Sequence, residues 1–159
     1  MADWVEVSLK GSEAERKRAD MYAELRLRQM RIGQIMGPSI WMEIENRINS
    51  DVTRHREFRG SEDPQITYVH MLAGFKCVTA EYPRVVMSFN SSDSMIASVK
   101  YDYGATFGAE RSWVRHIEIK FDDRDNYYLM FDGKRFDSPK QIAAALLAPL
   151  ADSNFVPPD

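Results

Sequence analysis

The spacing of apolar residues changes at Gln65, and this change constrains the fold more than any other feature of the sequence. Before Gln65, apolar side chains recur every three or four residues, as they do along one face of an α-helix. After Gln65, apolar and polar side chains alternate over short runs, as they do in β-strands, and turn residues lie between these runs. The sequence therefore predicts an α+β fold in which a helical part precedes a sheet.

Two helices are predicted within residues 12–63. Ser12-Glu13-Ala14-Glu15 has the form of a capping box, so the first helix should begin there, after an N-terminal segment over 1–11. Gly37-Pro38-Ser39 predicts its end, because proline cannot continue the helical hydrogen-bond ladder. The second helix repeats an apolar residue every four positions, which predicts a buried face. That face consists of Ile40, Ile44, Ile48 and Val52.

An antiparallel meander of about six strands is predicted over residues 64–136, because short loops between consecutive strands exclude parallel crossovers. The strands are expected near 65–71, 74–81, 84–90, 95–103, 112–121 and 126–131. Alternation within the last two predicts a sheet with one apolar face. A C-terminal helix over 137–151, indicated by a Ser138 cap and Pro139, should pack on that face, and 152–159 should form a tail.

Length and charge exclude several classes of protein. The 159 residues are 44% hydrophobic and 28% charged, which predicts a single globular domain over 1–159. The net charge of −3 gives no strongly basic face, so nucleic acid is not favoured as a partner. No apolar run approaches the roughly 18 residues that span a bilayer, and the N-terminus lacks a secretory pattern. We therefore expect a cytoplasmic protein without a membrane partner.

Residues that could carry catalysis or hold a metal ion do not converge in the sequence. His55, His70 and His116 lie far apart, and the acidic run over 122–125 lacks the spacing of a calcium loop. The lone Cys77 lies in a predicted strand, where it is interpreted as a small buried apolar residue. No catalytic residue, metal ligand or cofactor is assigned, and an enzymatic function is not favoured.

Aromatic residues interleaved with cations form the most suggestive pattern of the chain. Such a pattern can make an interface for a protein or a stacking surface for a single-stranded nucleic acid. Strands also favour aromatic residues simply to build a core. The candidate surface residues are Tyr101, Tyr103, Trp113, Arg115, His116, Tyr127 and Tyr128.

Three functions stay open on the sequence alone. The first is a non-enzymatic binding or accessory module that meets a protein, or a second copy of the chain, through the aromatic surface or the first helix. The second is a pocket for a small ligand, with or without catalysis, between the sheet and the second helix. Its candidate lining is Trp41, Trp113, His116 and Tyr127. The third is single-stranded nucleic-acid binding on the aromatic face of the sheet.

Overall fold

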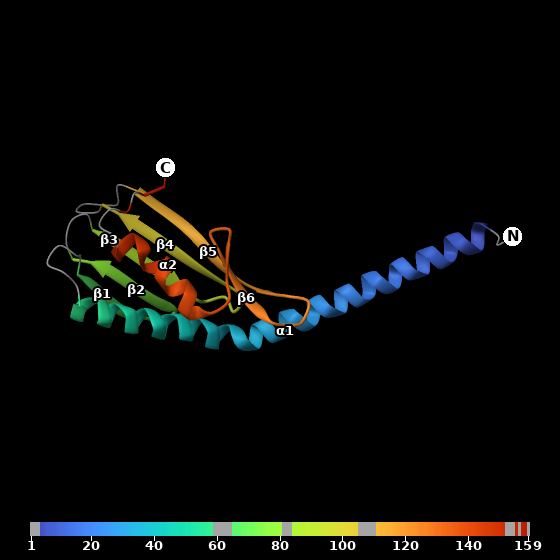
Figure 1. Ribbon diagram of the computed structural model, residues 1–159, viewed down its shortest axis with the longest axis horizontal. Helices are drawn as coiled ribbons and strands as arrows, with labels where there is room; N and C mark the ends of the chain where they lie inside the picture. Colours follow the sequence, from blue (N-terminus) through green and yellow to red (C-terminus); the bar gives the residue numbers. More distant parts are fainter. Residues whose placement is uncertain are drawn as a thin grey trace.

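The chain forms a long helix, an antiparallel sheet of seven strands and a C-terminal helix, in that order (Figure 1). The computed structural model describes residues 4–58, 65–80, 84–104, 111–151, 155 and 157–158. The predicted α+β class and element order are confirmed in these residues. The predicted tail over 152–159 lies largely outside them.

Helix α1 (Trp4–Phe58) is continuous where the sequence predicts two helices, so that prediction is wrong. It begins before Ser12 and passes through Pro38 without ending. A proline inside a helix costs roughly 3 kcal/mol, because it donates no backbone hydrogen bond. Burial of each apolar side chain in the following turns stabilises the protein by about 1.5–3 kcal/mol, which outweighs that cost. The predicted buried face is confirmed, since all four residues are at most 3% exposed: Ile40, Ile44, Ile48 and Val52.

Gly37 allows a close approach between α1 and the sheet and does not end the helix. A Cβ atom at this position would lie 2.7 Å from the backbone carbonyl carbon of Ser94, just before strand β4 (Ile96–Tyr103). One turn earlier, a Cβ on Gly33 would overlap the side chain of Met95. The two glycines therefore let the helix backbone rest on this segment.

The strands follow one another in sheet order, each antiparallel to the next. Their bounds are β1 Ile66–Met71, β2 Gly74–Thr79, β3 Val85–Asn90, β4 Ile96–Tyr103, β5 Arg111–Phe121, β6 Tyr127–Phe131 and β7 Lys134–Phe136. The sequence predicts six strands, and β7 is the additional one. It follows a two-residue turn in which Asp132 and Gly133 both have positive φ, at 53° and 73°, as a type I′ hairpin requires. Its three residues are too few to show an alternating pattern.

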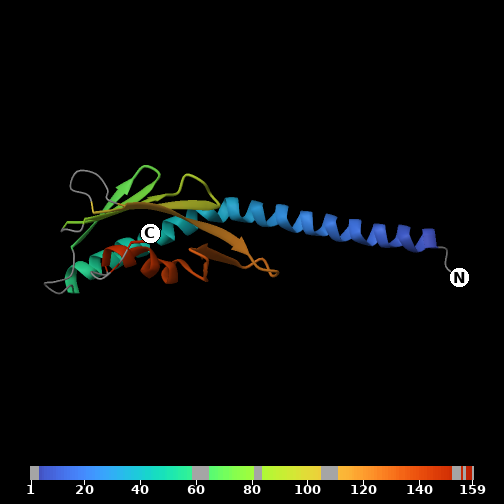
Figure 2. The same ribbon diagram turned by 90° about the horizontal axis from the view of Figure 1, so that it is seen from above.

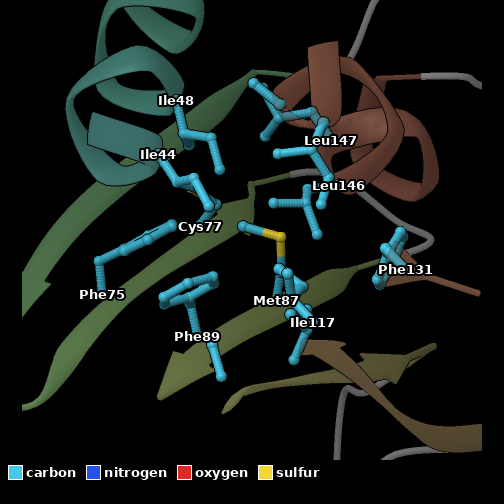
Figure 3. Close-up of a cluster of buried hydrophobic side chains, with 14 of the residues drawn as sticks. Ile44, Ile48, Phe75, Cys77, Met87, Phe89, Ile117, Phe131, Leu146 and Leu147 are labelled. Atoms are coloured by element: carbon cyan, nitrogen blue, oxygen red, sulfur yellow. The ribbon is translucent and has the colours of Figure 1, made fainter. Parts of the chain in front are cut away.

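Both helices cover the same face of the sheet (Figure 2). The second half of α1 lies beside α2 (Pro139–Ala151), and the two helices contact each other. Figure 3 shows side chains from both helices and from the strands meeting in one core, among them Ile48, Met87 and Leu146. On the opposite face Lys100 and Val114 are exposed. The predicted one-sided sheet is therefore confirmed.

Candidate functional site

Residues 4–24 of α1 form an arm that projects beyond the sheet, and every residue in it is exposed (Figure 1). At 1.5 Å per residue the arm is about 32 Å long. Large apolar side chains lie in solvent along it, with Trp4 78%, Met21 70% and Tyr22 63% exposed. A surface helix ordinarily turns such residues toward a core, so the arm offers an apolar surface for contact.

Several of the apolar residues of the arm share one helical face, which we call the arm stripe. Its members follow the alternating three- and four-residue spacing of a heptad pattern. They are Trp4, Val7, Gly11, Ala14 and Met21, together with the charged Arg18 and with Leu25, which lies just past the arm. Leu25 is half-buried, as are Ile32 and Met36 on the following turns. The stripe therefore leads from solvent to the edge of the buried face of α1.

A shallow hollow lies on the stripe near the base of the arm. It measures about 630 Å³, and its lining combines apolar and aromatic side chains with two arginines and one glutamate. The lining residues are Arg18, Met21, Tyr22, Glu24, Leu25 and Arg28. Such a hollow suits an apolar side chain that is accompanied by an acidic group.

Polar contacts hold the base of the arm against the hairpin between β5 and β6. The Arg28 Nη2 atom donates to the Asp125 Oδ2 atom at 2.7 Å. The Gln29 Nε2 atom donates to the Asp125 Oδ1 atom and to the Asp122 carbonyl oxygen, each at 3.1 Å. These bonds set the direction in which the arm leaves the sheet.

The acidic run over 122–125 closes this hairpin. The backbone N–H groups of Asn126 and Arg124 each donate to the Asp122 carboxylate at 2.9 Å, and they hold the pKa of that carboxyl below its usual value. Across the ranges that the structure describes, no three His, Cys, Asp or Glu side chains are grouped to hold a metal ion. The run has a structural role as a turn and as a brace for the arm.

Cys77 has the buried position that the sequence predicts. Its thiol is fully buried in β2, and this burial raises the pKa of Cys77 to about 12. A thiol with such a pKa is almost entirely protonated near neutral pH and is a poor nucleophile. Cys77 is therefore a core residue.

A second hollow, which we call the aromatic hollow, lies between β5 and the C-terminal turns of α2. It measures about 280 Å³. The ring of Trp113 stacks between those of Tyr101 and Phe155, with centroid distances of 5.1 Å and 6.0 Å. Beside them the Arg115 Nε atom donates to the Asp132 Oδ1 atom at 3.2 Å. The hollow offers an aromatic wall next to a charged pair.

The structure places the seven candidate surface residues on two different faces of the sheet. The face under the helices holds Tyr101, Tyr103, Trp113, Arg115 and Tyr127. The open face holds His116 and Tyr128, because adjacent strand residues point to opposite sides. The candidate pocket lining is divided in the same way. His116 lies on the open face, whereas the other three residues lie on the covered side of the sheet: Trp41, Trp113 and Tyr127.

The aromatic residues on the covered face belong largely to the core. Tyr101 is 1% exposed, and its hydroxyl donates to the carbonyl oxygen of Leu146 at 2.6 Å. On the open face, the Tyr128 ring lies 4.1 Å from the guanidinium carbon of Arg135. The seven residues therefore form no single contact surface, although Tyr101, Trp113 and Arg115 meet at the aromatic hollow.

A polar cluster that the sequence pattern does not predict lies where α1 meets β1. The Glu45 Oε1 atom accepts a hydrogen bond from the Tyr68 hydroxyl at 2.5 Å and lies 2.6 Å from the His70 Nδ1 atom. Burial, together with the bond to Glu45, raises the pKa of Tyr68, so its phenol stays protonated. The i, i+2 spacing of Tyr68 and His70 could have placed them on one strand face. Their partner on α1 is supplied only by the tertiary fold.

No protein-family model, curated protein or solved structure matches this chain. Within the described ranges, no helix combines the length and the apolar character needed to cross a membrane. A functional proposal therefore depends on the arm and the two hollows, since fold alone does not determine function.

Proposed function

We propose that this protein is a non-enzymatic protein-association module and that its arm makes the contact. The observation that carries the proposal is the exposure of Trp4, Met21 and Tyr22 along a helix that is braced at its base. Burying a large apolar side chain contributes about 1.5–3 kcal/mol. Several such anchors together can offset the cost of association, which is about 4–15 kcal/mol.

The arm is a stronger candidate than the open face of the sheet. The large apolar side chains of that face, such as Val114 and Ile96, are 46% and 42% exposed, against 63–78% for the three arm anchors. The anchors on the arm also share one helix, which is the arrangement by which amphipathic helices are recognised. Because the arm is already helical, a partner need not order it, and less conformational entropy is lost on binding.

Photocrosslinking from two positions tests this proposal. p-Benzoylphenylalanine is placed at Tyr22 on the arm or, as a matched control, at Val114 on the open sheet face. Illumination of cells that express each protein should give a covalent protein adduct from Tyr22 and none from Val114, and mass spectrometry identifies the partner. Adducts from Val114 alone, or from neither position, would contradict the proposal.

The aromatic hollow supports a second candidate, a site for a small planar ligand. The supporting observation is the Trp113 ring, which is half-buried beside the Arg115 guanidinium. A library of planar aromatic acids is screened by ligand-observed NMR against the wild type and Trp113→Ala. Ligands that bind the wild type and lose binding in the variant would support the site, and equal binding to both would remove it.

A further inference from the structure

The charges of α1 are divided between two consecutive segments. Residues 4–15 hold three acidic side chains and one lysine, a net charge of −2. Residues 16–31 hold six basic and two acidic side chains, a net charge of +4. The acidic segment carries Trp4 and Val7, and the basic segment carries the hollow on the stripe.

The two segments complement each other in charge and in shape. The hollow has Arg18 and Arg28 in its lining, and the segment that carries Trp4 has a net negative charge. A single arm cannot bring its own Trp4 into its own hollow, because the two lie about 30 Å apart on one rigid helix. The complementary surface must therefore come from another molecule, and a second copy of this chain carries it.

We infer that the arms of two copies pair side by side in antiparallel orientation, with Trp4 of each copy in the hollow of the other. This inference rests on the proposed function and names its partner. A two-fold axis near the middle of the arms generates both contacts at once, as an isologous interface requires. Acidic segments then face basic segments along the whole overlap.

The small residues of the stripe fit this pairing. In an antiparallel heptad arrangement, Val7 lies opposite Leu25, and Gly11 lies opposite Met21 of the other copy. A Cβ atom at Gly11 would meet no neighbouring side chain or strand within 4 Å, so this surface of the arm is open to a second helix. A glycine facing a methionine lets the two helices approach closely.

The position of the sheet disfavours the parallel alternative. The stripe leads to Ile32 and Met36, which are half-buried at the edge of the face of α1 that packs on the sheet. In a parallel pair both sheets would lie at this same end of the helix pair and would crowd each other. Like charges would also face each other along the arm. An antiparallel pair keeps the two sheets at opposite ends of the shared helices.

Light scattering and pulsed electron paramagnetic resonance on the full chain test the inference. A spin label on Glu6→Cys reports orientation, because antiparallel pairing places Glu6 opposite Arg26. The two labels are then 20 residues apart along the axis, about 30 Å. Parallel pairing places them side by side, below about 20 Å, given the usual 8–10 Å between helix axes. Wild-type protein taken through the same labelling controls for the buried Cys77.

Two matched substitutions test the interface. Met21→Ser removes a stripe residue, and by symmetry it does so twice in the dimer. It should weaken dimerisation roughly tenfold or more. Leu9→Ser removes an apolar side chain that is 61% exposed on the other side of the arm, and the dissociation constant should stay within about twofold.

The inference is supported by a dimer whose labels are about 30 Å apart and whose dimerisation is weakened by Met21→Ser but not by Leu9→Ser. A monomer, a dimer with labels below about 20 Å, or equal effects of the two substitutions would overturn it. The proposed function is judged separately by the Tyr22 crosslink. If the chain is monomeric and Tyr22 still crosslinks to a different protein, only the inference fails, whereas the absence of any adduct removes both.

Discussion

Substitution of Gly37 by alanine should destabilise the protein, although alanine is the better helix former. A Cβ at this position would lie 2.7 Å from the carbonyl carbon and 3.1 Å from the Cα of Ser94. Carbon atoms in ordinary contact are about 3.5–4.0 Å apart. The obstructing atoms belong to the backbone and cannot rotate away, so α1 and the segment before β4 must separate.

The magnitude follows from two opposing effects. Forcing an extra carbon into a packed interior costs about 1–3 kcal/mol, and a backbone overlap belongs at the upper end of that range. Alanine in place of glycine contributes about 1 kcal/mol to helix stability. The free energy of unfolding should therefore fall by about 2 kcal/mol, the difference of those two estimates. For a chain of this size the melting temperature should fall by about 4–8 °C.

Two other glycines of α1 provide controls for Gly37→Ala. A Cβ at Gly33 would overlap the flexible side chain of Met95, which can move away. Gly33→Ala should therefore lower the free energy of unfolding less than Gly37→Ala does. A Cβ at Gly11 would meet no atom within 4 Å, so Gly11→Ala should not destabilise the core. Urea unfolding followed by near-ultraviolet circular dichroism reports the free energy of the core in each variant. If Gly37→Ala proves as stable as Gly11→Ala, the close approach of α1 to Ser94 is refuted.

Three further predictions concern single side chains. Tyr101→Phe removes the donor to the Leu146 carbonyl and should lower the free energy of unfolding by about 1–2 kcal/mol in urea. The pKa of Asp122 lies below its ordinary 3.8 in the folded protein, so the stability that its charge contributes is present above pH 3.8 and is lost as the pH falls through the folded value. Wild type and Asp122→Asn should therefore differ in stability at neutral pH and converge in acid, and a constant difference would contradict this account. Because burial raises the pKa of Cys77 to about 12, an aromatic disulfide reagent should leave it unmodified in the folded protein and react with it in denaturant, with absorbance as the readout.

Local periodicity predicted the parts of the fold in which burial repeats regularly. The four-residue spacing from Ile40 to Val52 marks the buried face of α1, and two-residue alternation marks the strands. The continuity of α1 through Pro38 could not be predicted in this way. The local chemistry of Gly-Pro favours an end, whereas the continuation is stabilised by contacts with residues more than 40 positions away, such as Phe89 against Trp41.

The candidate site was less accessible to sequence reasoning. The aromatic pattern groups Tyr127 with Tyr128, but the strand geometry separates them onto two faces. The first helix is named among the possible contact surfaces, but its exposure is not evident from the sequence, because residues 12–36 have a charged amphipathic pattern that is typical of an ordinary surface helix. Exposure of its apolar side chains depends on where the sheet ends.

The sequence by itself determined the order of the elements, the one-sided sheet and the buried face of α1 from Ile40 to Val52, because side-chain periodicity shows which face of each element is buried. Only the tertiary structure decided that α1 is a single helix, that Gly37 serves a close contact and that the first 21 residues of α1 extend beyond the sheet. These properties depend on where elements distant in the chain meet. The arm stripe is solvent-exposed because the sheet covers α1 only beyond residue 24.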